Sequence, residues 1–360
     1  MKARLPVRRA ILQRQTYEAP AEGRNGKVRL DFNENTSGCG PAVLRAIGKL
    51  EAKRLAMYPE YAKPTRRLAK YFGVAQQELL LSNGGDDALR VFFDTFVEPG
   101  SHILICEPTF PMYRYWAEIA GARVAALRYD CQMQFPVAEF IRALKKQPRV
   151  AFIANPNNPT GTLLAPELIQ QILRASQRTA LVMDEAYAEF SGASVVPLIR
   201  KYPQLFITRT FSKAAGLAGL RLGAVMACRA SLALLKRAMP PFPVNVAALV
   251  AAEAATADRT AIRDYVQETR QRLKRFDGEL QELGVKTFPS AGNFLLADFG
   301  EAGTALFKKL AAHGILVRVR SKDIGPGFVR ISIGTEAEMK QLMKVIRAEL
   351  RKQKVMPGAG

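Results

Sequence analysis

Residues 150–161 read VAFIANPNNPTG, an apolar run from Val150 to Ala154 followed at once by polar, proline-broken residues. The same change recurs at 180–187, where ALVM precedes DEAY, and at 205–213, where LFIT precedes RTFSK. Short apolar runs between longer amphipathic stretches predict an α/β fold with a mostly parallel sheet. We assign three further runs to that sheet, at 103–106, 124–127 and 222–227.

Polar side chains follow three of these predicted strands: Asn158, then Asp184 with Tyr187, then Lys213. In an open α/β sheet, ligands bind in the crevice outside the carboxyl ends of the strands. We therefore expect these four side chains to converge on one small molecule. Taken singly they have plainer explanations, because an Asp after a strand is often a helix cap and a Lys before a Gly-rich turn is often a solvated charge.

Lys213 stands beside the hydroxyls of Thr210 and Ser212 and upstream of Arg221. An amine beside hydroxyls and a cation suits Schiff-base chemistry on a phosphorylated aldehyde, which is the chemistry of pyridoxal 5'-phosphate (PLP). The pattern predicts a PLP site.

At this point the chain resembles the fold-type-I PLP aminotransferases, and within them the histidinol-phosphate aminotransferase branch, over nearly its whole length. The motifs that carry the resemblance are 30–35 (LDFNEN), Tyr58-Pro59, 83–87 (NGGDD), 108–110 (PTF), 155–161, 184–187, 212–221, Asn293-Phe294 and 329–334 (VRISIG). The resemblance implies a large domain with a mostly parallel central sheet and a smaller α+β domain. We expect an N-terminal arm at 1–31 that joins the small domain, a large PLP-binding domain at 32–245 and a small domain at 246–360.

The resemblance also assigns roles to the residues at the strand ends. Asp184 would keep the pyridine nitrogen protonated, so that the ring accepts electrons from the substrate carbanion. Tyr187 and Asn158 would hydrogen-bond the 3-oxygen of the ring. Lys213 would form the Schiff base and then carry the proton between two substrate and cofactor carbons.

A phosphate cradle is expected where Gly84, Gly85 and Asp86 open an amphipathic run, because a helix N-terminus suits an anion. Arg221, Thr210 and Ser212 would complete it, although a Gly-Gly turn before a helix also occurs without any phosphate. The resemblance implies that Phe110 stacks on the pyridine ring; the alternative is a core phenylalanine. It also implies that Tyr58 reaches the partner's cofactor phosphate across a homodimer interface.

The substrate side is assigned to four residues. Arg330 lies on an alternating strand and could pair with a carboxylate in bidentate fashion. Arg318, Tyr17 and Asn33 match family positions, and Arg318 with Tyr17 could hold a distal phosphate; the plain alternative for Arg318 is a surface charge. The usual family proline after NEN is Thr36 here, and Ala215 stands where a phenylalanine is usual; both departures affect loops and packing around the pocket, and neither removes a catalytic group.

Composition excludes several other classes of protein. The 360 residues carry a formal charge of +21, which favours anionic ligands, but the basic residues are scattered at helical spacing and predict no nucleic-acid partner. Two histidines and four dispersed cysteines argue against a metal site or a disulfide framework. No apolar stretch is long enough for a membrane span, and the basic start lacks the apolar core of a signal peptide, so we expect a cytoplasmic protein.

The function that the resemblance implies is that of a homodimeric, PLP-dependent aminotransferase that converts L-histidinol phosphate and 2-oxoglutarate to imidazole acetol phosphate and L-glutamate. An aromatic amino acid aminotransferase and a PLP-dependent threonine-phosphate decarboxylase remain alternatives, because all need Lys213, Asp184 and an anion pocket.

Overall fold

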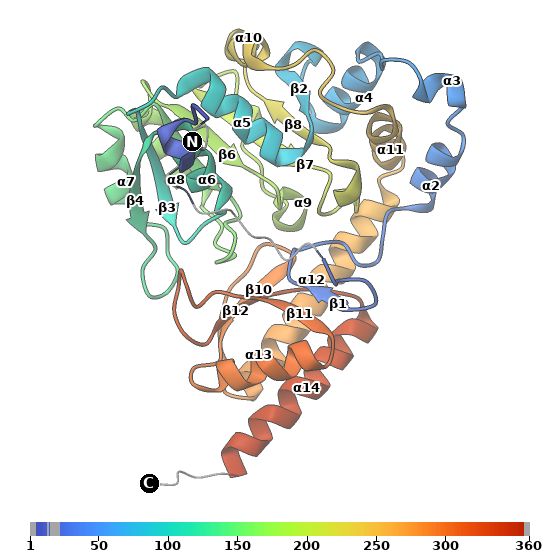
Figure 1. The fold of residues 1–360 in the computed structure, drawn as a ribbon, viewed down its shortest axis with the longest axis vertical. Helices are drawn as coiled ribbons and strands as arrows, with labels where there is room; N and C mark the ends of the chain where they lie inside the picture. The colour runs from blue at the N-terminus through green and yellow to red at the C-terminus, as the bar shows by residue number, and fades with distance from the viewer. Residues whose placement is uncertain (1–4, 13, 15–21, 356–360) are drawn as a thin grey trace.

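The computed structural model describes residues 5–12, 14 and 22–355, which form two lobes built on separate sheets (Figure 1). The larger lobe contains a seven-stranded sheet and the smaller lobe a five-stranded sheet. Their helices, numbered along the chain, are α1 (Arg9–Leu12), α2 (Pro41–Gly48), α3 (Ala52–Leu55), α4 (Ala62–Phe72), α5 (Gly84–Phe96), α6 (Met112–Ala120), α7 (Val137–Leu144), α8 (Pro166–Ala175), α9 (Ala188–Ser191), α10 (Arg229–Ala238), α11 (Val246–Ala257), α12 (Thr260–Glu282), α13 (Ala302–Ala312) and α14 (Glu336–Val355).

The large sheet has the order β2-β8-β7-β6-β5-β3-β4. Its strands are β2 (Leu79–Ser82), β8 (Gly223–Met226), β7 (Leu205–Thr210), β6 (Ala180–Asp184), β5 (Val150–Ala154), β3 (His102–Glu107) and β4 (Arg123–Arg128). The five strands from β7 to β4 are parallel to their neighbours, whereas β8 is antiparallel to both β7 and β2. The predicted α/β fold with a mostly parallel sheet is confirmed; β2 was not among the predicted strands.

Both faces of this sheet are covered, as the short apolar strands predict. Along β5, Ala151 and Ile153 belong to one hydrophobic cluster, while Val150, Phe152 and Ala154 belong to another. Alternate residues of a strand point to opposite faces, so the two clusters are the two sides of one sheet. The polar residues that follow β5, β6 and β7 therefore lie at the rim, beyond the packed layers.

The small sheet has the order β1-β11-β12-β10-β9, with bounds β1 (Val28–Leu30), β11 (Ile315–Val319), β12 (Phe328–Ser332), β10 (Phe294–Asp298) and β9 (Lys286–Phe288). The strand nearest the N-terminus, β1, pairs in parallel with β11. The chain thus starts the small sheet, crosses to build the large lobe, and returns.

The helical stretch that links the two lobes is divided into two helices, α11 and α12. Asp258 takes an extended backbone conformation that ends α11, and its carboxylate then accepts the backbone N–H of Thr260 at 3.0 Å. Asp258 therefore ends α11, and its side chain also contacts the first residue of α12.

The packing of these helices also bears on the lobe boundary, which was expected after residue 245. Ala248 and Leu249 of α11, and Ile262 near the start of α12, pack in the core of the large sheet, whereas Phe276 and Leu280 pack under the small sheet. We propose that the lobes divide within α12 and not before α11. No helix among the described residues is long and apolar enough to cross a membrane.

Candidate active site

A cavity of about 430 Å³ lies between the lobes, at the carboxyl ends of the parallel strands. The large lobe supplies side chains that follow β5, β6 and β7, and the small lobe supplies arginines from β11 and β12. Twelve residues singled out from the sequence line it: Gly85, Asp86, Phe110, Asn158, Asp184, Tyr187, Thr210, Ser212, Lys213, Arg221, Arg318 and Arg330.

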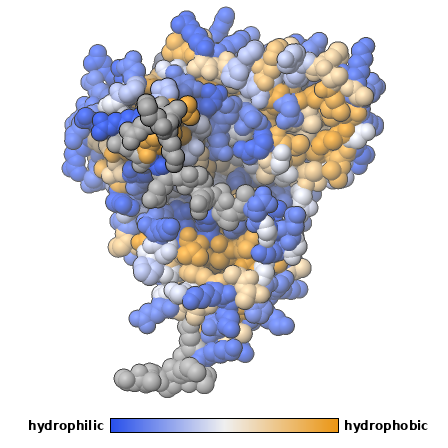
Figure 2. All heavy atoms as spheres, in the orientation of Figure 1, coloured by the Kyte–Doolittle hydropathy of each residue, from blue (hydrophilic) through white to orange (hydrophobic). Residues whose placement is uncertain are grey.

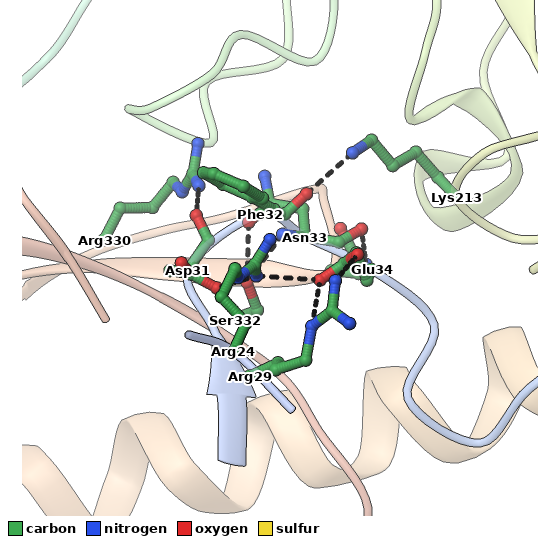
Figure 3. A network of polar contacts seen from close by, with 10 residues as sticks. Arg24, Arg29, Asp31, Phe32, Asn33, Glu34, Lys213, Arg330 and Ser332 are labelled. Atoms are coloured by element: carbon green, nitrogen blue, oxygen red, sulfur yellow. Dashed lines mark hydrogen bonds and ion pairs between the residues drawn. The ribbon is translucent and has the colours of Figure 1, made fainter. Parts of the chain in front are cut away.

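Lys213 points its amine at the chain segment that leads from β1 into the large lobe. Its Nζ donates to the carbonyl oxygen of Phe32 at 2.8 Å, and Figure 3 shows Lys213 and Arg330 approaching residues 31–34 from opposite sides. Burial, followed by the nearby Arg330 guanidinium, lowers the pKa of Lys213 to about 8. A lysine amine tuned in this way is neutral more often at physiological pH and can act as a nucleophile or a proton carrier.

Asp184 ends β6, and its carboxylate is held on both oxygens. Oδ2 accepts the hydroxyl of Tyr113 at 2.7 Å, and Oδ1 accepts the backbone N–H of Ala186 at 3.2 Å. Burial raises the pKa of Asp184, although these hydrogen bonds act in the opposite direction. A cation placed against this carboxylate would offset the cost of burying its charge.

Tyr187, Asn158 and Arg330 form one connected chain of side chains. Asn158 donates from Nδ2 to the Tyr187 hydroxyl at 3.3 Å and accepts from Arg330 Nη1 at 2.5 Å. Arg330 also donates to the Asp31 carbonyl oxygen, and its buried Nε has no hydrogen-bond partner among the described residues. Burial lowers the pKa of Arg330 to about 10, so the side chain stays charged at neutral pH. An anion in the cavity would supply the missing acceptor.

The start of α5 forms the other end of the cavity. Gly84 has φ of +80°, and a Cβ there would lie 2.8 Å from Nη2 of Arg221. The glycine therefore allows Arg221 to lie against the first turn, where its Nη2 is 3.3 Å from Oδ2 of Asp86. The Thr210 hydroxyl donates to Ser212 Oγ at 2.9 Å on the same side. Backbone N–H groups of a helix start, two hydroxyls and a guanidinium are the donors that a phosphate needs.

Among the described residues, three of the predicted site residues do not line the cavity. Gly84 lies beneath Arg221, and Asn33 is fully buried behind Tyr187, so Asn33 does not face a substrate. Tyr58 is 78% exposed and stacks on Phe242 with 4.5 Å between ring centroids. Tyr17 lies outside the described residues.

Several lining or supporting residues were missed from the sequence. Arg320 lines the cavity, is paired with Asp323, and follows Arg318 by two residues, the spacing that puts strand side chains on one face. That spacing was a readable signal. The contacts of Glu34 and Tyr113 could not be read from the sequence, because they depend on how distant segments meet. Glu34, another lining residue, lies in the 30–35 motif and is held by Arg24 and Arg29, and Tyr113 reaches Asp184 from α6. Among the described residues, no cluster of His, Cys, Asp or Glu could hold a metal ion.

Comparison with known proteins agrees with this geometry. Residues 25–346 match the family model described as aminotransferase class I and II. The chain is 35% identical to a histidinol-phosphate aminotransferase of Geobacillus sp. (strain WCH70), over 91% of this chain and 92% of the relative, and 36% identical to that of Geobacillus thermodenitrificans, over 91% of both. The structure matches that of histidinol-phosphate aminotransferase from Sinorhizobium meliloti in complex with pyridoxal-5'-phosphate, with a TM-score of 0.90, 25% identity, and coverage of 98% and 99% of the two chains.

The family model matches most of the chain, and the relatives are more than one-third identical to it. Both findings agree with the site, in which a lysine, a carboxylate, a phenol and an arginine line one cavity at the ends of the parallel strands. The chain belongs to the aminotransferase class I and II family and, within it, to the histidinol-phosphate aminotransferase branch.

Proposed function

We propose that this protein is a PLP-dependent aminotransferase that moves an amino group between L-histidinol phosphate and 2-oxoglutarate, giving imidazole acetol phosphate and L-glutamate. The observation that carries the proposal is the convergence of Lys213, Asp184, Tyr187 and Arg330 on one cavity between the lobes. The relatives named above support the choice of substrate.

The residues present fit PLP. The start of α5 with Arg221, Thr210 and Ser212 would hold the phosphate, and Asp184, with its raised pKa, would face the protonated ring nitrogen. Phe110 lines the same cavity and would lie against the ring. When bound, PLP supplies an aldehyde that joins to amines and a ring that withdraws electrons from the carbon bearing the amine.

The protein's own groups then have separate tasks. Lys213, with a pKa of about 8, releases and takes up a proton at its Nζ near neutral pH, and the Phe32 carbonyl holds this amine when it is free. Tyr187 and Asn158, which line the same cavity, would hydrogen-bond the 3-oxygen of the ring. Arg330 binds an anionic substrate group near the amine through donors that include the orphaned Nε.

Both substrates are polyanions at neutral pH, since one carries a phosphate and the other two carboxylates. Three guanidinium groups, those of Arg318, Arg320 and Arg330, line the cavity wall contributed by the small lobe. We propose that Arg318 and Arg320 hold the distal carboxylate of 2-oxoglutarate and share the phosphate of L-histidinol phosphate with Arg330. Such a wall favours phosphorylated substrates over neutral aromatic side chains.

We also propose that the enzyme acts as a homodimer in the cytoplasm, without a nucleic-acid partner. Large apolar side chains are exposed on one side of the large lobe: Leu44, Leu55, Met57, Tyr58 and Phe242. Figure 2 shows apolar residues gathered over the region of α2, α4 and α11. A patch of this kind on a soluble protein marks an interaction surface, and a second copy would bring Tyr58 to the partner's phosphate site.

Single-turnover spectroscopy tests the function. The PLP-loaded protein is mixed separately with L-histidinol phosphate, L-phenylalanine or L-threonine phosphate, and the cofactor's visible band is followed. Fastest conversion to the pyridoxamine form by L-histidinol phosphate is the expected result. Fastest conversion by L-phenylalanine would favour the aromatic aminotransferase, and carbon dioxide release with an unchanged final spectrum would favour the decarboxylase.

A further inference from the structure

The phenol oxygen of Tyr187 receives two amide N–H groups, one from each side. Asn33 Nδ2 donates to it at 2.9 Å and Asn158 Nδ2 at 3.3 Å. A phenol oxygen has two acceptor sites and one hydrogen of its own. Since both acceptor sites are used, the hydrogen is left to point elsewhere, and Tyr187 borders the cavity.

The orientation of the Asn158 amide follows from its second partner. Arg330 is a donor only, so the Asn158 atom that meets Nη1 must be the oxygen Oδ1. The amide nitrogen of Asn158 is then the atom that faces Tyr187.

The orientation of the Asn33 amide is set by Ser332, at the end of β12. The backbone N–H of Asn33 donates to Ser332 Oγ at 2.9 Å, and Ser332 Oγ in turn donates to Asn33 Oδ1 at 2.8 Å. Asn33 has a left-handed backbone with φ of +55°, a conformation that asparagine tolerates better than most residues. Its carbonyl oxygen accepts from Asn293 Nδ2 at 3.1 Å. The backbone N–H, the backbone carbonyl oxygen and Oδ1 of Asn33 are therefore all hydrogen-bonded to other residues. Nδ2 is the group that donates to Tyr187.

We propose that Asn33 and Ser332 are positioning residues that direct the hydroxyl hydrogen of Tyr187 into the cavity, where it is donated to the 3-oxygen of PLP. This inference rests on the proposed function. Asn33 does not line the cavity, and both residues act through Tyr187. Ser332 belongs to the small sheet and Tyr187 follows a strand of the large sheet, so the arrangement requires both lobes to be in place.

The consequence is electrostatic. A hydrogen bond donated to the 3-oxygen favours its negatively charged form, and so weakens the hold on the proton shared between that oxygen and the nitrogen joined to the cofactor. The loss of this proton changes the visible absorbance, so its titration reports the hydrogen bond directly and without turnover.

Asn33→Asp is the sharpest test, because it keeps the size of the side chain but replaces a donor with an acceptor that captures the Tyr187 hydrogen. We expect the midpoint of the absorbance titration of the PLP-loaded protein to rise by about one pH unit, the effect of one lost hydrogen bond to a charged oxygen. Ser332→Ala, which frees the Asn33 amide to turn, should raise the midpoint by less. It also carries the test if Asn33→Asp does not fold, as judged by thermal unfolding without cofactor.

Two controls separate hydrogen bonding from added charge. Asn35→Asp adds the same charge two residues away, on a side chain that bonds Ala214 O and the Ser37 backbone, and should shift the midpoint much less. Tyr187→Phe raises the midpoint by itself, and adding Asn33→Asp to it should give no further rise. The other charged residues that line the cavity with Lys213 are unchanged in all variants: Glu34, Asp86, Asp184, Arg209, Arg221, Arg318, Arg320 and Arg330.

The outcomes distinguish this inference from the function on which it rests. A wild-type protein that gives no visible band with PLP would remove the proposed function. A wild-type band whose midpoint is the same in Asn33→Asp, or rises equally with and without the Tyr187 hydroxyl, would overturn the positioning role alone.

Discussion

The hydroxyl of Tyr113 donates to Oδ2 of Asp184 at 2.7 Å, from a side chain that is wholly buried between α6 and the large sheet. Burial raises the pKa of both groups, and the hydrogen bond lowers that of Asp184. Tyr113 also stacks on Phe152 of β5 with 5.0 Å between ring centroids, which fixes the ring that carries the hydroxyl. The carboxylate proposed to face the pyridine nitrogen is therefore held by a residue that does not line the cavity.

Tyr113→Phe removes this donor and should lower kcat about tenfold while leaving KM nearly unchanged. The loss of one hydrogen bond to a charged oxygen is about 1.4 kcal/mol, which is tenfold in rate if it is felt in the transition state. The pKa of Asp184 should also rise. The acid side of the rate–pH profile should therefore move to higher pH than in the wild-type protein. Stopped-flow kinetics at a series of pH values measures kcat and its pH dependence. A change in KM with unaltered kcat would assign Tyr113 to packing alone.

The titration of Lys213 predicts how the protein captures its cofactor. Only the neutral amine attacks an aldehyde, and burial lowers the pKa of this amine to about 8. The rate of PLP incorporation should therefore rise about tenfold from pH 7 to pH 9 and then level off, whereas an ordinary lysine would continue to gain up to about pH 10.4. Borohydride trapping followed by mass spectrometry measures the modified fraction.

Two variants sharpen that experiment. Lys213→Ala should give no trapped adduct at this peptide and no transamination. Glu34→Gln removes a negative charge that raises the pKa of Lys213, so the plateau should begin at a lower pH. A plateau that stays where it is in Glu34→Gln would mean that the carboxylate does not act on the amine.

The parts of the site that could be read from the sequence are those set by local pattern. Parallel strands end at a common edge, so Asn158, Asp184 and Lys213 could be placed together without coordinates. The roles of Tyr113, Glu34 and Ser332 could not be read in this way, because each acts on a residue far away in the chain. The motifs that contain Glu34 and Ser332 do not say which residue that is. Asn33 shows the difference: its position matched a family motif, but its left-handed backbone turns the amide toward Tyr187 and away from the cavity.

Arg320→Gln tests the second anion site on the small lobe. The variant should lower kcat/KM for L-histidinol phosphate by about ten- to a hundredfold, the range expected when a charge-assisted hydrogen bond is lost, and leave that for unphosphorylated L-histidinol nearly unchanged. Lys322→Gln, an exposed cation two residues further on, is the matched control. Equal losses with both amino donors would assign Arg320 to holding the loop through Asp323.

Arg330→Lys keeps the charge but loses the planar fork of donors. Wild-type Arg330 donates to Asn158 and to the Asp31 carbonyl oxygen and retains Nε for a ligand, which a single ammonium group cannot reproduce. KM for 2-oxoglutarate should rise at least about tenfold. An unchanged KM for this acceptor would remove Arg330 from the anchoring role.

The exposed apolar side chains of the large lobe predict that the active unit is a dimer. Leu55→Asp should shift the protein toward monomers in sedimentation equilibrium and lower its activity in proportion, because charge at a buried interface is costly. Leu234, on α10, is another exposed leucine. Leu234→Asp adds the same charge there and should leave the dimer intact. A wild-type protein that sediments as a fully active monomer would contradict this prediction.

Tyr58 lies 78% exposed and does not line the cavity of its own chain, which a role in the partner's site would explain. Lys213→Ala and Tyr58→Ala should each be inactive or nearly so. In hybrid dimers, however, one of the two sites would combine an intact Lys213 with an intact Tyr58 donated from the other chain. Random reassociation makes about half of the dimers hybrid, so mixing should restore about a quarter of wild-type activity. If Tyr58 served its own chain, no hybrid site would be complete and mixing would restore nothing.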